Sequence, residues 1–130
     1  MIGESIESRT AAMTGRLAFL QTGLGAARLR IYGNTRPVAV TDVPGADPLV
    51  EIALATPPGS VANGALTLVA AGPGDVMQSG DANWVRVVNG DGATAFDMDA
   101  GGKTSGKECI LSDAALWAGG LVSILSAVLG

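Results

Sequence analysis

The chain has 130 residues, which allows one hydrophobic core and is too short for two. Its formal net charge of −4 argues against a nucleic-acid partner, because proteins that bind nucleic acids present clustered Lys and Arg to the phosphates. Histidine is absent and Cys109 is the single cysteine, so His-dependent triads and an internal disulfide framework are excluded. We expect Cys109 to be an inert, partly buried thiol.

A helix is expected first, from about Glu4 to Thr22, and Gly23 and Gly25 are suited to end it. The apolar residues of this segment recur at the spacing of one helical face: Ile2, Ile6, Met13, Leu17 and Leu20. Gly15 costs the helix about 1 kcal/mol relative to Ala, so the helix needs a surface to pack on. Residues 1–25 are therefore expected to pack on the chain's own sheet or on a neighbouring subunit, in front of a β-domain over residues 26–130.

Short strands separated by Gly and Pro turns are expected over the rest of the chain. Pro57-Pro58-Gly59 is expected to stop one of them. Residues 36–48 are expected to be a loop or a ragged edge segment, and residues 76–82 a loop. Besides one hairpin, alternation of apolar and polar residues predicts strands at 27–32, 49–55, 65–70, 108–112 and 116–129. About seven short strands are typical of a mainly β fold, here an antiparallel sandwich or small barrel preceded by one α-helix.

The strongest local signal is a hairpin over residues 84–99. Its turn, Asn-Gly-Asp-Gly at 89–92, tolerates the positive φ that tight hairpins require. One face is expected to carry Val85, Val87, Phe96 and Met98, and the other Trp84, Arg86, Asp97 and Asp99. On the polar face we expect an ion pair between Arg86 and the aspartates, worth about 0.2 to 1 kcal/mol. Trp84 is expected to be exposed there and available to a partner.

Three patterns suggest chemistry, but their contexts favour structural roles. Gly102-Lys103-Thr104 resembles the end of a P-loop, yet Asp97 stands where the motif needs glycine and no helix pattern follows. Residues 90–95 fit the loose dinucleotide fingerprint, but the next residues alternate as a strand does. Asp97 and Asp99 lie about 6 to 7 Å apart on a strand, without the sugar platforms or calcium loop that would give the pair a function. We expect no enzymatic activity, cofactor or metal.

Residues 114–130 are uncharged and apolar, which allows two interpretations. The segment is at the short end of the length needed to span a membrane, and its glycines and serines favour a buried terminal strand. That strand would place Leu121, Leu125 and Leu129 on one face and Val122, Ile124 and Val128 on the other. The other interpretation is that this segment anchors the chain in a membrane, which would make it a small membrane-anchored protein.

Candidate interaction residues come from the charge distribution and the two tryptophans. Residues 1–36 hold five arginines against two glutamates, whereas the rest of the chain is acidic. The basic third is suited to an acidic neighbour, and solvated helix and strand faces are the alternative. The candidate interaction surface is Arg9, Arg16, Arg28, Arg30, Arg36, Trp84 and Trp117.

The order of these pieces resembles a family of small tailed-bacteriophage virion proteins found with head and tail structural genes. The matching features are the N-terminal helix, residues 25–32 followed by Thr-Arg-Pro at 35–37, the hairpin, Thr-Ser-Gly at 104–106 and Ala-Gly-Gly at 118–120. The C-terminal run departs from the Thr- and Ser-rich last strand of such proteins, since it is more apolar.

The resemblance implies an accessory virion component that is made in the host cytoplasm and has no enzymatic role. Such a protein decorates or cements the capsid surface by binding the major capsid protein and itself, as a homotrimer or homodimer. A head-tail joining, tail or fibre component is the alternative within the virion.

Overall fold

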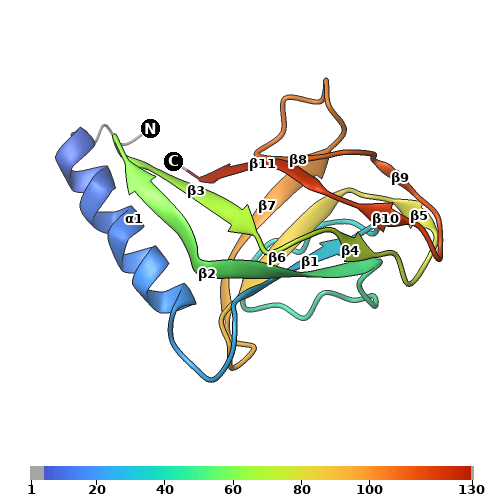
Figure 1. The fold of residues 1–130 in the computed structure, drawn as a ribbon, viewed down its shortest axis with the longest axis horizontal. Coiled ribbons are helices and arrows are strands. Elements are labelled where there is room, and N and C mark those ends of the chain that lie inside the picture. The colour runs from blue at the N-terminus through green and yellow to red at the C-terminus, as the bar shows by residue number, and fades with distance from the viewer. Residues whose placement is uncertain (1–4, 130) are drawn as a thin grey trace.

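Seven strands close into a barrel in the computed structural model, which describes residues 5–129 (Figure 1). Neighbouring strands follow the order β1-β2-β3-β11-β8-β7-β6. The barrel strands are β1 (Arg28–Tyr32), β2 (Val50–Ala62), β3 (Ala65–Ala70), β6 (Trp84–Val88), β7 (Thr94–Gly101), β8 (Cys109–Leu111) and β11 (Ile124–Leu129). Two short sheets pair β4 (Gly74–Asp75) with β10 (Leu121–Val122), and β5 (Gly80–Asp81) with β9 (Ala115–Leu116). The predicted mainly β fold with one N-terminal helix is confirmed, and it is a barrel.

The hairpin of β6 and β7 forms the part of the barrel that the sequence predicts best. Val85 is opposite Met98 and Val87 is opposite Phe96, as expected for residues that share one face. These side chains point into the barrel, where Val85, Val87 and Met98 are fully buried. β7 then pairs with β8 in parallel, so residues 102–108 connect two parallel strands and do not form a hairpin.

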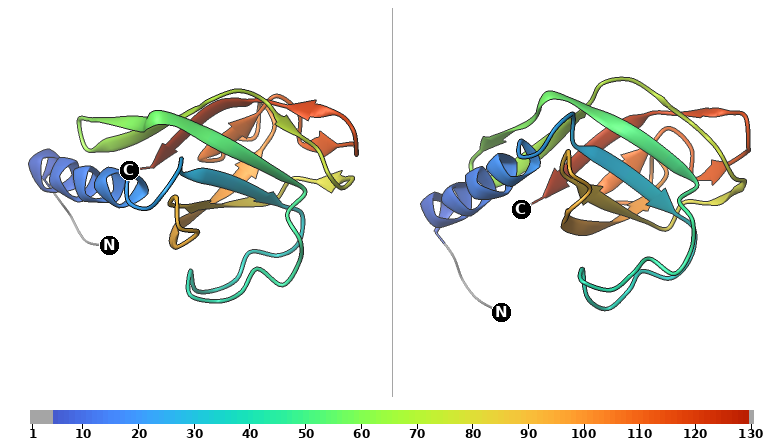
Figure 2. Two further views of the ribbon diagram at one scale, coloured as in Figure 1. Left: turned by 60° about the horizontal axis from the view of Figure 1, so that its bottom comes forward. Right: turned by 90° about the horizontal axis from the view of Figure 1, so that it is seen from below.

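Helix α1 (Ile6–Leu20) packs on the chain's own barrel, against β2, β3 and β7. Met13 and Leu20 are buried in the core, but Ile6 is exposed, so the predicted apolar face contacts the barrel only from Met13 onward. Ser5 caps the helix, and Ile2 and Glu4 of the prediction lie outside the described residues. In Figure 2 the helix lies across one end of the barrel.

Hydrogen bonds to two turns of the barrel hold α1 and the residues that follow it in place. The Oγ1 of Thr10 accepts from the backbone N–H of Gly64 in the β2–β3 turn, at 2.9 Å. Beyond the end of α1, the carbonyl of Thr22 accepts from Gly90 of the β6–β7 turn, and the Thr22 hydroxyl accepts from the Asn89 side chain. The helix is therefore fixed between two turns at the same end of the barrel.

Two strand predictions are wrong in their details. β2 continues through Pro57 and Pro58, because its register with β3 shifts between Leu54 and Gly59 and prolines fit where ladder hydrogen bonds are missing. The second error concerns β11, whose register with β8 shifts between Ile124 and Ser126. The alternation of side chains that point into and out of the barrel is therefore shifted along the C-terminal segment, and both Leu125 and Val128 are exposed.

Residues 115–129 supply strands β9, β10 and β11, and buried Ala127 and Val122 join the core. Within residues 5–129 the structure contains no helix of the length and apolar character needed to cross a membrane.

Cys109 lies fully buried at the start of β8, and burial raises the pKa of its thiol from 9.0 to about 12. In the unfolded chain the thiol ionises first, so stability that is present below pH 9 falls as the pH rises toward about 12. We expect the free energy of unfolding to decrease by about 1 kcal/mol between about pH 9 and about pH 10 from this group. Denaturant titrations at both pH values measure the decrease, which should be smaller in Cys109→Ala. Equal decreases in the two proteins would contradict this account.

Candidate interaction surface

Four charged side chains form a row across the outer face of strands β2, β1, β6 and β7. The strand registers align Glu51 with Arg30, Arg30 with Arg86, and Arg86 with Asp97. Arg30 Nε donates to Glu51 Oε2 at 2.9 Å. Arg86 makes a two-pronged contact with Asp97, from Nε to Oδ1 at 2.8 Å and from Nη2 to Oδ2 at 3.0 Å. The predicted ion pair is therefore present between Arg86 and Asp97.

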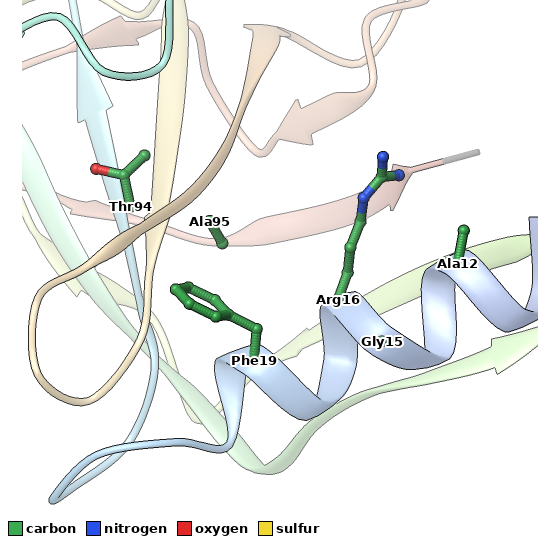
Figure 3. A pocket seen from close by; sticks show the side chains of 6 residues that line it. All are labelled: Ala12, Gly15, Arg16, Phe19, Thr94 and Ala95. Atoms are coloured by element: carbon green, nitrogen blue, oxygen red, sulfur yellow. The ribbon is translucent and has the colours of Figure 1, made fainter.

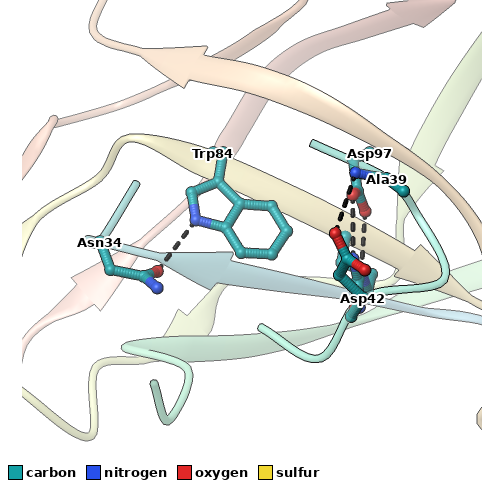
Figure 4. Close-up of polar contacts among 6 residues, drawn as sticks. Asn34, Ala39, Asp42, Trp84 and Asp97 are labelled. Carbon is teal, nitrogen blue, oxygen red and sulfur yellow. Dashed lines mark hydrogen bonds and ion pairs between the residues drawn. The ribbon is translucent and has the colours of Figure 1, made fainter. Parts of the chain in front are cut away.

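The covering loop, residues 33–48, lies over part of this row and buries it (Figures 2 and 4). The Asp42 carbonyl accepts from Arg86 Nη1 at 2.7 Å, and Arg36 forms an ion pair with Asp99 at 3.2 Å. The side chains of Arg86 and Asp97 are only 5% and 4% exposed. The pair is thus an interior ion pair, unlike the solvent-exposed pair for which about 0.2 to 1 kcal/mol was expected.

Trp84 is fully buried, so the prediction that it is an exposed contact residue is wrong. Its ring stacks on Tyr32, with centroids 4.4 Å apart, and the Arg86 guanidinium lies 5.3 Å from the ring. The indole Nε1 donates to Asn34 Oδ1 of the covering loop at 3.0 Å. The strand pattern assigned Trp84 to the correct face, but it carries no information about a loop that covers this face.

The cluster under the covering loop consists of Tyr32, Trp84, Arg86 and Asp97, and it is suited to a structural role. Its hydrogen bond to Asp97 raises the pKa of Arg86, so the guanidinium keeps its charge at all physiological pH values. Burial likewise raises the pKa of Tyr32, an effect that the charges of Arg30 and Arg86 partly offset. Both groups therefore keep their protons near neutral pH.

The other suspected motifs also have structural explanations. Asp99 is paired with Arg36, and exposed Lys103 and Thr104 lie in a turn that leads to strand β8. In the β6–β7 turn, a Cβ at Gly90 would lie 2.6 Å from the Gly25 carbonyl oxygen, so close backbone packing explains this glycine. Residues 5–129 contain no group of three or more side chains arranged to hold a metal ion.

The seven candidate residues lie in separate places and do not form one surface. Arg28 and Arg30 contact Glu51, and Arg36 of the covering loop contacts Asp99. Arg9 and Arg16 lie on α1, where Arg16 is exposed and its Nη1 is 3.3 Å from Met13 Sδ. Trp117 follows β9 and is 73% exposed. The structure therefore leaves α1 and the turn after β9 as two separate candidate contact regions.

Both regions hold exposed apolar side chains that the sequence did not single out. Near Trp117, Leu121 is 65% exposed and Met77 is 56% exposed. Their segments are joined because the backbone N–H of Val76 donates to the Gly120 carbonyl. On α1, Phe19 is 39% exposed. The composition, which is 48% hydrophobic, is typical of a protein with such a surface but does not indicate its position.

A depression of about 280 Å³ lies between α1 and β7 (Figure 3). The residues that line it are Ala12, Gly15, Arg16, Phe19, Thr94 and Ala95.

Comparisons with protein-family models, curated proteins and solved structures found no match for the chain. Functional assignment accordingly depends on the residues and geometry described above.

Removal of either partner of the Arg86–Asp97 pair should destabilise the protein by about 3 to 5 kcal/mol, because the remaining charge is buried alone. The double variant Arg86→Met, Asp97→Leu should lose several kcal/mol less than the sum of the single losses. Denaturant unfolding of the four proteins measures this coupling. As a matched control, Arg36→Met with Asp99→Leu removes a pair that is 42% and 46% exposed, and should cost below about 1 kcal/mol. Additive losses for Arg86 and Asp97 would contradict the assignment.

The two tryptophans should differ in fluorescence, because Trp84 is 0% exposed and Trp117 is 73% exposed. Trp117→Phe, which keeps Trp84, should emit at shorter wavelength and resist quenching by acrylamide. Trp84→Phe, which keeps Trp117, should emit at longer wavelength and be quenched strongly, with circular dichroism as the check on folding. Similar quenching of the two variants would show that the covering loop does not shield Trp84.

Proposed function

We propose that the protein is a structural component of a tailed-bacteriophage virion, which decorates or cements the capsid by binding the major capsid protein and other copies of itself. The observation that carries this proposal is the exposed apolar group of Trp117, Leu121 and Met77. Exposed aromatic residues beside other apolar residues are typical of protein contact sites. The sequence motifs that resemble small phage virion proteins supply the biological setting.

The closed barrel supports a role in which side chains make the contacts. Each barrel strand has a neighbour on both sides, so strand addition to an open barrel edge is not the mode of binding that this fold favours. The charged row on the outer face is satisfied largely within the chain, by the contacts of Arg30 and Arg86, and Arg36 of the covering loop is paired with Asp99. The exposed apolar side chains are therefore better suited to partner contacts than the paired arginines.

Binding to particles that lack this protein tests the proposal. Purified protein is mixed with such particles, unbound protein is removed by sedimentation, and the particles are imaged by electron cryo-microscopy. We expect extra density at regular positions on the capsid surface, with untreated particles as the control.

Two results would overturn the capsid assignment. Density restricted to the neck, tail or fibres would replace decoration by a joining or tail role within the virion. Failure to bind any particle, at concentrations where the protein is folded, would remove the virion assignment itself.

A further inference from the structure

We propose that Trp117 of one copy of this protein docks into the depression on α1 of a second copy, so that copies associate head to tail. The inference deepens the proposed function, on which it rests for its biological setting, by naming the self-contact. The association itself is a property of the purified protein and is measured without any virus particle.

The Trp117 turn is held in a fixed shape. Gly120 N–H donates to the Trp117 carbonyl at 2.9 Å, and Gly119 N–H donates to the Val76 carbonyl at 2.8 Å. Ala118 N–H donates to the Ser79 hydroxyl at 2.9 Å. Because this backbone is already ordered, presenting the indole to a partner costs little conformational entropy.

The depression on α1 has the composition of a site for an aromatic side chain. Gly15 lines the depression, and a Cβ added there would meet no atom within 4 Å, so the site is open above this residue. Figure 3 shows Phe19 pointing from α1 toward Ala95, with Arg16 one turn earlier on the helix. Phe19 is placed to contact an aromatic ring, and Arg16 to place its cation against the ring face. A volume of about 280 Å³ is just below that of pockets for drug-sized ligands and suits a single side chain.

The charges of the two regions are complementary. Residues 71–85 and 112–122, which form the region around Trp117, contain Asp75, Asp81 and Asp113 but no Lys or Arg. The described part of α1 holds Arg9 and Arg16 against one acidic residue, Glu7. Within residues 5–129, these three aspartates and two arginines take part in no ion pair. Two Trp117 regions facing each other would bring acidic groups together, whereas contact with α1 brings opposite charges together.

The positions of the two regions determine the kind of assembly. In Figures 1 and 2, α1 lies at one end of the molecule, and β9 and β10, which flank the Trp117 turn, lie at the other. A contact between opposite ends is heterologous, so a pair of copies keeps one free Trp117 region and one free depression on α1. Such contacts close into a ring when the rotation permits and otherwise extend as a chain.

Substitution at Gly15 separates assembly from folding. Gly15→Leu fills the depression and also replaces glycine by a better helix former, so the variant should melt at or above the temperature of the original protein. Trp117→Ala removes the docked side chain instead. In sedimentation-velocity experiments we expect each change to raise the concentration for half-association at least about tenfold.

Val38→Ala is the matched control, because Val38 is fully exposed on the covering loop and should leave association unchanged. Retained association in Trp117→Ala would overturn the proposal, as would an original protein that stays monomeric at its highest soluble concentration. If the original protein stays monomeric but binds capsids, the self-contact is wrong and the virion role stands. If it associates but binds no particle, the virion role is wrong and the self-contact stands.

Disulfide trapping identifies the contact directly. Ala12→Cys places a thiol in the depression and Ala118→Cys places one beside Trp117, while native Cys109 is fully buried, which leaves it inaccessible to the introduced thiols. Mixed under oxidising conditions, the two variants should form a dimer with one disulfide between residues 12 and 118. Dimers that join two copies of residue 12 would instead identify α1 on α1 as the contact and overturn the assignment to Trp117.

Discussion

The buried pair of Arg86 and Asp97 is the interaction on which the arrangement of the outer sheet face depends. Asp97 receives two hydrogen bonds from the guanidinium, and the remaining Arg86 Nη1 donates to the Asp42 carbonyl of the covering loop. A buried charge pair is tolerated only when its hydrogen bonds are satisfied. The Asp42 carbonyl satisfies a guanidinium N–H that the carboxylate does not reach, so the loop helps to offset the cost of burying the pair. The same loop closes over Trp84 and Tyr32, which gives the barrel a second, smaller packed layer outside its core.

Closing that face determines which surfaces remain for partners. The barrel wall has a neighbour for every strand, and most arginines of the basic N-terminal third are occupied by Glu51 or Asp99. The exposed apolar side chains that frame our proposals lie toward the two ends, on α1 and around the turn after β9. Gly15 fits this division, because a helix that lacks a side chain at an exposed central position gains from a partner that fills the gap.

Local signals in the sequence predicted the parts of the fold that local chemistry decides. The Asn-Gly-Asp-Gly turn and the alternation on both sides of it specify the β6–β7 hairpin, including the partnership of Arg86 with Asp97. The burial of Trp84 could not be predicted in this way, because it depends on a hydrogen bond that the indole N–H donates to Asn34, 50 residues away along the chain. Register shifts in β2 and β11 were missed for a related reason, since a bulge depends on the partner strand. The α1 depression had one local sign, an unexplained glycine within a helix.

Hydrogen-deuterium exchange, read peptide by peptide in the free and the assembled protein, tests the central claim that the ends make the contacts while the covered face is already closed. We expect peptides containing residues 6–20 and 115–122 to exchange more slowly after assembly, whereas residues 84–88 should be protected in both states, as part of a buried strand. New protection confined to the covering loop, with residues 6–20 and 115–122 unchanged, would contradict it.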